Sequence, residues 1–450
     1  GKEIAYLGSA ISTFQQSPKV FQDCSDWGLQ LKKHKNSDLP NFWQNHDQYI
    51  QASAFLGQNM FRLSFEISHL CPRLGEFDEK VMEKYVEILL KILSSGQEPM
   101  VALFHWTLPA FFSSSEKESA WDHPRILDHF FFYIDRIYQY LNNKQKIQMI
   151  MKNLRLPLIW QEKILGRDLV RYFISLNEPS TYNLNSFLVG AFPPYNKGNV
   201  VKFEKNLNLW FRIHDQIYEK FGNRNNNQSQ VGISHNWTFF EGPLGFILQK
   251  LINERTLNKF ERITGDYSDF FSLQYYCRFK LFPYLMHTRF PKLSKRLLKK
   301  YNFGDHPGFG DIYPHGMYEN LKRMHTMYPN KELWVTEFGF ADNSDLNRPY
   351  HLFETFREIL MAIKDGIKIK GVLIWSIAQN FEWDQGMKVD FGLLKEKDLL
   401  KPYKNTVVKT WEVWQAILAC CRGGSSEKLK ALWVKAYKQY RVLKDAHEKK

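Results

Sequence analysis

Short apolar or β-branched runs recur along the chain and alternate with longer stretches whose apolar positions follow a helical period. The eight runs are Ile4–Gly8, Met60–Phe65, Met100–Trp106, Val170–Leu176, Val231–His235, Phe270–Tyr275, Leu333–Phe338 and Val372–Ser376. The clearest helical stretches have apolar residues at Val81, Tyr85, Ile88, Leu89 and Ile92 before Gly96, and at Met317, Leu321 and Met324 after Pro314. Eight strands that alternate with helices predict an α/β fold, a single (β/α)8 TIM barrel with insertions.

Two segments fall outside this alternation. Residues 141–168 lie between the third helix and the fourth strand and carry six Lys or Arg against two acidic residues. A Gly-Gly-Ser-Ser stretch at 423–426 precedes a tail with apolar residues at helical spacing and many lysines. We therefore expect a barrel domain over residues 1–418, with 141–168 as a basic insertion before strand four, and a basic helical C-terminal tail over residues 419–450.

Both basic segments have two interpretations. A solvated helix that packs on the barrel wall is favoured, because most amphipathic stripes face the core of their own protein. The alternative is peripheral membrane contact through residues 141–168 and 425–450, since basic amphipathic helices also bind anionic lipid surfaces. The sequence leaves the oligomeric state open.

Composition limits the function only loosely. The 450 residues are 44% hydrophobic and 16% aromatic, which is enough for a large core. The formal charge of +14 favours polyanionic partners but does not identify a reaction. Five cysteines without regular spacing predict neither a disulfide framework nor a zinc site. Without a recognisable leader or an apolar run of membrane-spanning length, we expect a cytoplasmic protein.

Polar residues cluster at the ends of the predicted strands. In a β/α barrel the reactive residues sit at the C-terminal ends of the strands. These positions hold Arg62, His105, Trp106, Asn177, Glu178, Tyr276, Glu337 and Trp375. The two glutamates each end an apolar run, and paired carboxyl groups are what cleavage of a glycosidic bond requires, because one must donate a proton and the other must be ionised.

Five motifs in the same order give the chain a resemblance to glycoside hydrolase family 1, the β-glucosidase family, from about Ile4 to about Leu418. They are Phe61-Arg62-Leu63-Ser64, Phe104-His105-Trp106-Thr107-Leu108-Pro109, Phe173-Ile174-Ser175-Leu176-Asn177-Glu178-Pro179, Trp334-Val335-Thr336-Glu337-Phe338-Gly339, and Trp375-Ser376 followed by Asn380-Phe381-Glu382-Trp383. The resemblance implies that residues 1–418 form a catalytic domain.

The resemblance also implies roles for individual residues. Glu178 resembles the family's acid/base and Glu337 its nucleophile. Arg62 would keep Glu337 ionised, and Tyr276 would hydrogen-bond it. The implied substrate-binding residues are Gln15, His105, Trp106, Asn177, Trp375, Glu382, Trp383 and Phe391. The resemblance implies no metal and no organic cofactor.

Several positions depart from the residues that the family usually has. Phe338 follows the nucleophile in place of Asn, Gln274 replaces Asn before the tyrosine pair, and Gln379 replaces Asp. Asp390 stands in place of Arg. After Gln15, Gln16-Ser17-Pro18 replaces the acidic residue and glycine that usually follow. None of these removes a catalytic carboxyl group, and together they indicate an altered pocket or aglycone region.

The resulting prediction is a retaining β-glycosidase that hydrolyses a β-glucoside, β-galactoside or β-fucoside through a covalent glycosyl-enzyme intermediate. One alternative is a transglycosylase that moves the sugar to a sugar or lipid acceptor. A second is a carbohydrate-binding relative with a disused or weak catalytic site. A nucleic-acid binder rests on positive charge alone, because no zinc-finger spacing or phosphate-binding loop accompanies it, so we expect no nucleic-acid partner.

Overall fold

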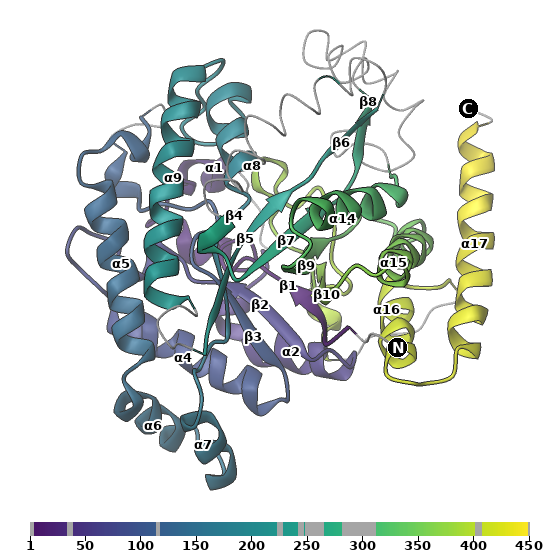
Figure 1. Ribbon diagram of the computed structural model, residues 1–450, viewed down its shortest axis with the longest axis horizontal. Helices are drawn as coiled ribbons and strands as arrows, with labels where there is room; N and C mark the ends of the chain where they lie inside the picture. The colour runs from purple at the N-terminus through teal and green to yellow at the C-terminus, as the bar shows by residue number, and fades with distance from the viewer. Residues whose placement is uncertain are drawn as a thin grey trace.

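Eight parallel strands close into a barrel in the computed structural model, which describes residues 4–33, 39–113, 118–222, 228–241, 247, 265–280, 312–400 and 407–448. The barrel order is β1-β10-β9-β7-β5-β4-β3-β2, and every neighbouring pair is parallel (Figure 1). The strands are β1 (Tyr6–Ala10), β2 (Met60–Ser64), β3 (Glu98–Ala102), β4 (Tyr172–Asn177), β5 (Gln230–Asn236), β7 (Phe270–Tyr275), β9 (Glu332–Phe338) and β10 (Ile369–Trp375). The predicted (β/α)8 barrel is confirmed.

Every predicted run overlaps one barrel strand, and the differences lie at the strand ends. The clearest difference is β3, which ends at Ala102, whereas the sequence analysis extended it to Trp106. His105 and Trp106 therefore lie in the loop after the strand. Trp106 has a φ of 72°, a left-handed conformation that a strand does not accommodate. The run of apolar residues in the sequence therefore extends beyond the end of the strand.

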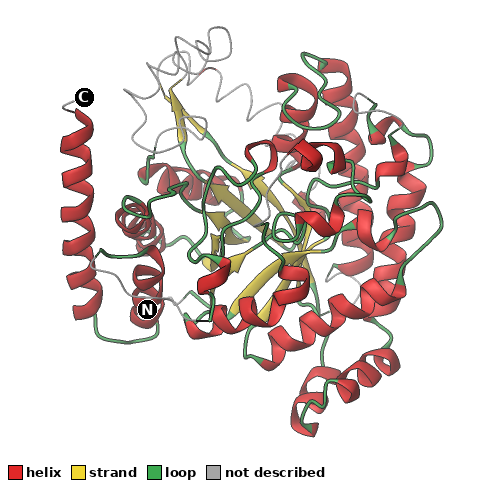
Figure 2. Cartoon of the chain, turned by 180° about the vertical axis from the view of Figure 1, so that it is seen from behind, coloured by secondary structure: helices red, strands yellow, loops and turns green. Residues whose placement is uncertain are grey.

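Helices surround the barrel, as Figure 2 shows from behind. Those in the described part of the chain are α1 (Gly28–Lys33), α2 (Phe42–Phe55), α3 (Ile67–Leu70), α4 (Glu79–Ser94), α5 (Ile126–Leu141), α6 (Lys144–Asn153), α7 (Leu158–Leu165), α8 (Pro179–Asn183), α9 (Val200–Phe221), α14 (His315–Met327), α15 (Arg348–Lys364), α16 (Thr410–Cys421) and α17 (Glu427–Glu448). The two helices that the sequence predicts most clearly are α4 and α14.

Local chemistry explains the limits of α4. The Asp78 carboxylate caps its first turn by accepting the N–H groups of Lys80 at 2.9 Å and Val81 at 3.0 Å. Tyr85, Ile88, Leu89 and Ile92 are fully buried on its inner face. The chain then turns at Gly96, whose φ is 81°.

A two-stranded parallel ribbon stands outside the barrel. It pairs β6 (Phe239–Glu241) with β8 (Arg278–Lys280), directly after barrel strands β5 and β7. The sequence does not predict it, because strands of three residues carry too short a pattern to be recognised. The ribbon extends two neighbouring strand ends beyond the barrel rim (Figure 1).

Aromatic rings fill the barrel interior at the end where the strands begin. Trp334 is fully buried, and its ring centroid lies 4.9 Å from that of Tyr172, 5.5 Å from that of Tyr6 and 5.6 Å from that of Phe270. Gly371 makes room for the indole, because a Cβ there would lie 2.3 Å from the Trp334 Cζ3 atom. This cluster, which we call the aromatic plug, closes one end of the barrel.

The C-terminal tail forms a helix against the barrel wall, as the favoured interpretation predicted. α17 follows α16, which runs to Cys421, three residues beyond the predicted domain limit at 418. The Tyr440 ring stacks on Tyr350 of α15 with centroids 4.3 Å apart, and the Gln439 amide donates to the Leu346 carbonyl at 2.8 Å. The division of the chain at residue 418 stays a prediction. No helix within the described ranges has the length and apolar character needed to cross a bilayer.

Trp334→Ala should destabilise the fold by about 3–5 kcal/mol, because it removes the ring on which the aromatic plug is packed and leaves a cavity. Thermal denaturation followed by circular dichroism measures the effect. Val442→Ala on the exposed side of α17, where the valine is 69% exposed, is the control and should leave the melting temperature nearly unchanged. An equal melting temperature for Trp334→Ala and the parent would contradict this packing role.

Candidate active site

A cavity of about 340 Å³ opens where the barrel strands end. Eleven of the twelve predicted site residues line it, namely Gln15, His105, Trp106, Asn177, Glu178, Tyr276, Glu337, Trp375, Glu382, Trp383 and Phe391. The twelfth, Arg62, is fully buried and contacts two of the lining residues. The structure therefore brings all twelve together at one end of the barrel.

Glu337 is the penultimate residue of β9 and is held by three neighbouring side chains. The Tyr276 hydroxyl donates to its Oε2 at 2.6 Å, and the Gln274 amide donates to its Oε1 at 2.8 Å. The Arg62 guanidinium forms an ion pair with the same Oε1. Because Glu337 is only 4% exposed, these contacts replace most of the hydration that its carboxylate loses on burial.

Asn177 shares two of these donors and is fixed by two more side chains. Its Oδ1 accepts from Arg62 and, at 2.7 Å, from Gln274. Its backbone carbonyl accepts from the Trp106 indole at 2.8 Å, and its amide nitrogen lies 3.1 Å from His105 Nε2. Burial, with the Arg62 charge acting in the same direction, holds the pKa of His105 well below its usual range, so the neutral ring accepts the amide proton.

Glu178 follows β4 and begins α8. Glu178 is 3% exposed, and the polar side chains of Thr181 and Asn236, which line the same cavity, partly oppose the rise in its pKa. Its φ is 42°, and two other residues that line the cavity are also left-handed, Trp106 at 72° and Trp383 at 45°. Such conformations are strained for residues with large side chains and are typical of functional sites, where the surrounding structure holds them in place.

The two glutamates differ in acidity for identifiable reasons. Burial raises the pKa of Glu178 well above its ordinary value, and the nearby charge of Glu337 raises it further. Burial also raises the pKa of Glu337, an effect that the sequence does not reveal. Arg62 lowers it as expected, and hydrogen bonds from Tyr276 and Gln274 lower it too. Glu337 therefore ionises before Glu178.

Glu382 lies across the cavity among amide donors. Its Oε2 accepts from Asn380 at 2.7 Å and from Gln15 at 3.3 Å. Burial raises its pKa to about 8, with the charge of Glu337 contributing, so the group is largely protonated near neutral pH. Beside it the Trp383 ring stacks on Phe14, with centroids 5.3 Å apart.

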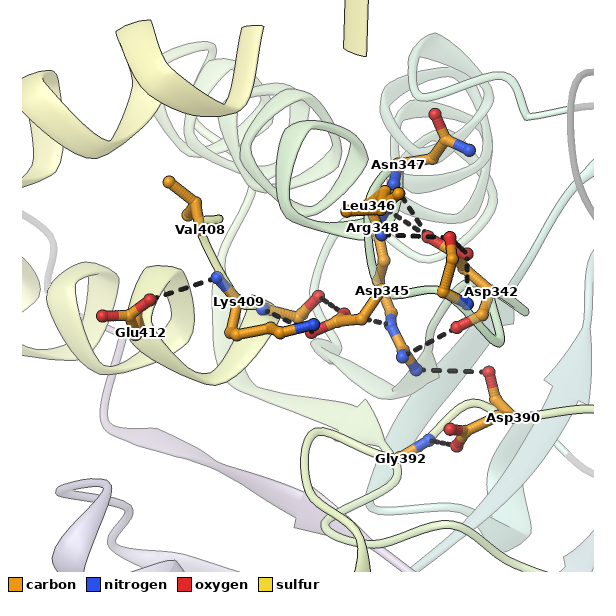
Figure 3. Close-up of polar contacts among 12 residues, drawn as sticks. Asp342, Asp345, Leu346, Asn347, Arg348, Asp390, Gly392, Val408, Lys409 and Glu412 are labelled. Atoms are coloured by element: carbon orange, nitrogen blue, oxygen red, sulfur yellow. Dashed lines mark hydrogen bonds and ion pairs between the residues drawn. The ribbon is translucent and has the colours of Figure 1, made fainter. Parts of the chain in front are cut away.

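A buried arginine anchors the loop after β10, which carries part of the cavity wall (Figure 3). Arg348 at the start of α15 donates to the backbone carbonyls of Asp390 at 3.2 Å and Asp342 at 3.0 Å, and to the Asp345 carboxylate at 3.0 Å. Asp390 directly precedes Phe391, which lines the cavity. Arg348 thus ties the segment after β9 to the segment after β10.

Lys395 links Gln379 and Asp390, two of the residues that differ from those usual in the family. The Lys395 ammonium donates to Gln379 Oε1 at 2.9 Å and forms an ion pair with Asp390. The Asp390 carboxylate also accepts the Gly392 N–H at 2.8 Å. The carboxylate at 390 and the cation at 395 therefore form one structural unit behind Phe391.

Several residues of the site could not be assigned from the sequence. Gln274 stood out only as a departure, yet it is fully buried behind the cavity and bonds both Glu337 and Asn177. Asn236 at the end of β5 lines the cavity. Their place at strand ends was the signal that could have identified both. The remaining lining residues are Thr181, Leu184, Asn185, Ala191, Phe192, Thr238, Cys277, Asp384 and Gln385, which lie after the strands in segments without a recognisable pattern.

Known proteins share both the sequence pattern and the fold. The chain is 23% identical over 414 residues to furostanol glycoside 26-O-beta-glucosidase of Hellenia speciosa, covering 81% of this chain and 72% of that protein. It is 23% identical over 382 residues to galactolipid galactosyltransferase SFR2, chloroplastic, of Arabidopsis thaliana, covering 79% of this chain but only 54% of that protein. The chain thus spans about half the length of the second relative.

A solved structure gives the same picture for the fold. The family 1 β-glucosidase from Thermotoga maritima has a TM-score of 0.69 at 19% identity, over 94% of this chain and 98% of that chain. The sequence model of glycosyl hydrolase family 1 matches residues 21–161 and 256–397, which together are more than half of the 450 residues. The chain therefore belongs to glycosyl hydrolase family 1.

Proposed function

We propose that Glu337 and Glu178 divide the cleavage of a β-glycosidic bond between them, with Glu337 as nucleophile and Glu178 as general acid and then base. Membership of glycosyl hydrolase family 1 makes the chain a glycosidase for β-glycosides. The roles of individual residues rest on one observation above all. Two buried glutamates line the same cavity, and their surroundings give them different acidities.

In the first step the Glu337 carboxylate attacks the anomeric carbon while Glu178 gives its proton to the departing oxygen. The alcohol leaves, and the sugar is bound to Glu337 as an ester. Esterification removes the Glu337 charge, which was one of the causes that raised the pKa of Glu178. Glu178 then ionises more readily and takes a proton from water, and the resulting hydroxide equivalent releases the sugar from Glu337.

The residues around the two glutamates suit sugar binding. Gln15, His105, Asn177 and Glu382 offer hydrogen bonds to ring hydroxyls, and Trp375 offers an apolar face to the sugar C–H groups. Asn177 already contacts Arg62, so a sugar hydroxyl bound there would join the network that holds Glu337. Trp106, Trp383 and Phe391 complete the aromatic surround of the cavity.

Transfer to an acceptor other than water is the second candidate. Leu184, Ala191 and Phe192 give part of the cavity wall an apolar character that suits an apolar acceptor or aglycone. A relative named as a galactolipid galactosyltransferase is in keeping with this reading. Comparing free sugar with transferred sugar in the products, with and without an added alcohol acceptor, distinguishes transfer from hydrolysis.

Some predictions from the sequence remain predictions. They are the exact glycone, the oligomeric state, the cytoplasmic location, and peripheral membrane contact through residues 141–168 and 425–450. For residues 141–168, exposed apolar and basic side chains support membrane contact.

Glu337→Gln should lower turnover of an aryl β-glucoside by about a thousandfold or more, because the amide cannot attack the anomeric carbon. In the parent protein, a 2-deoxy-2-fluoro β-glucosyl donor with a good leaving group should label Glu337, as peptide mass analysis will detect. Glu98→Gln is the matched control, a buried glutamate paired with Arg167 at the opposite end of the barrel, and should keep normal turnover. A label on any other residue would refute the assignment.

Glu178→Gln should discriminate between leaving groups. Substrates with poor leaving groups need a proton and should slow by about 10²–10⁴-fold, whereas attack on an activated aryl glycoside should persist. The alkaline limb of the pH profile should also disappear, since activity otherwise falls as rising pH ionises Glu178. Steady-state rates on a series of leaving groups measure both effects. Equal slowing of good and poor leaving groups would show that Glu178 is not the acid.

Glu382→Gln should make the protein more stable than the parent as the pH rises. The folded-state pKa of Glu382 is about 8, above its ordinary value, so the folded state keeps a proton that the unfolded state releases. The parent therefore loses stability between about pH 4.5 and 8, at about 1.4 kcal/mol per pH unit at most, and the variant does not. Melting temperatures across this range measure the difference. The exposed Glu76→Gln should follow the parent, and a pH-independent difference for Glu382→Gln would contradict the argument.

A further inference from the structure

The basic insertion forms a helical hairpin that projects from the lower edge of the molecule in both views (Figures 1 and 2). Its helices are α6 and α7, joined by residues 154–157. Ile147, Ile150 and Met151 of α6 and Ile164 of α7 are at most 4% exposed and fix the hairpin to the barrel. Leu154, Leu156 and Leu165 are partly buried against the same core, so the hairpin packs without Met149, Leu158 and Ile159.

These three side chains are largely exposed to water. Leu158 and Ile159 at the start of α7 are 75% and 74% exposed, and Met149 of α6 is 55% exposed. Exposed aliphatic side chains of this size gain free energy from any apolar medium that covers them, and neighbouring ones are typical of a binding surface. We call Leu158, Ile159 and Met149 the apolar tip.

Positive charges lie within three or four positions along the chain of each residue of the apolar tip. Lys152, Arg155 and Lys163 are exposed, and none of them forms an ion pair with another described residue. The Lys163 ammonium lies 4.9 Å from the centroid of the half-buried Trp160 ring. Glu162 is the one acidic side chain of α7. An indole beside apolar side chains and lysines is the combination found where helices lie in the headgroup region of a membrane.

The charges and the indole beside the apolar tip identify its partner as a bilayer. Lys152, Arg155 and Lys163 are exposed cations that suit anionic headgroups, and the Trp160 indole suits the boundary between headgroups and acyl chains. Leu158 and Ile159 suit the apolar layer beneath. We propose that the α6–α7 hairpin docks this protein onto an anionic lipid bilayer, with Leu158 and Ile159 entering the apolar layer and Lys152, Arg155 and Lys163 contacting the headgroups. The proposal does not depend on the reaction proposed above.

The position of the hairpin sets the orientation on the membrane. α7 leads into the start of β4, and the cavity lies at the other end of that strand, where Asn177 and Glu178 follow. A protein docked through the apolar tip therefore turns its cavity away from the bilayer that holds it. Docking fixes where the enzyme works, and the substrate reaches the site from the aqueous side.

Cosedimentation of the full chain with vesicles tests the proposal. The parent should bind vesicles of phosphatidylcholine and phosphatidylserine and bind pure phosphatidylcholine at least about fivefold less, and added salt should weaken binding. The double variant Leu158→Asp/Ile159→Asp should lose at least about fivefold in binding to the anionic vesicles, because charged side chains resist entry into the apolar layer. The charge variant Lys152→Glu/Lys163→Glu should lose binding to a similar extent.

Val201→Asp is the matched control. Val201 is 80% exposed at the start of α9, near the cavity end of the barrel, and its variant should bind vesicles like the parent. All variants should keep the parent melting temperature and its turnover of a soluble aryl glycoside, which separates docking from folding and catalysis. Absence of binding by the parent, equal binding to both vesicle types, or full binding by Leu158→Asp/Ile159→Asp would overturn the proposal.

Discussion

The ion pair between Arg62 and Glu337 is the interaction around which the site is organised. Arg62 is fully buried, and an unpaired charge at that depth would be very unfavourable. Its guanidinium bonds Glu337 through one nitrogen and Asn177 through another, so it joins β2, β9 and β4 across the barrel interior. A single cation thereby fixes the position of a carboxylate, opposes the rise in its pKa and orients the amide beside it. The closed barrel holds the Arg62 guanidinium and the Glu337 carboxylate together, so that each neutralises the charge of the other. The chemistry of the site therefore depends on the fold.

Outward from that pair, the site is built by contacts between neighbouring loops. Gln274 and Tyr276 approach Glu337 from β7 and the segment after it, and the Trp106 indole holds the Asn177 carbonyl. Arg348 and Lys395 secure the loop that carries Phe391 from behind. The left-handed backbone at Glu178 is tolerable because the surrounding elements determine its position.

The sequence was sufficient for the parts of the structure that repeat or follow a known motif. Each barrel strand overlaps a short apolar run, and polar residues lie at or just after the ends of several of them, so both the strands and the clustering of Glu178 with Glu337 could be predicted. The end of β3 could not, because Leu103 to Trp106 are apolar or aromatic and yet leave the strand. The exposed tip of α7 was likewise recognised only as a basic segment, since the pattern of a helix does not show which of its apolar residues the fold leaves uncovered.

Polar contacts between residues far apart in the chain could not be predicted from the sequence either. Gln274 was visible as an unusual residue, but its two acceptors lie on other strands, 63 and 97 positions away in the chain. The link from Lys395 to Gln379 and Asp390 likewise depends on how a loop folds back on itself. Such pairings follow from the closed geometry of the barrel and leave no periodic trace in the sequence.

The aromatic plug formed around Trp334 makes the cavity a blind pocket. With Tyr6, Tyr172 and Phe270 packed against that indole, the barrel offers no passage through its axis. Glycoside, water and released alcohol can therefore reach Glu178 and Glu337 only from the side of the loops that follow the strands, so those loops, and not the packed interior, determine which molecules enter.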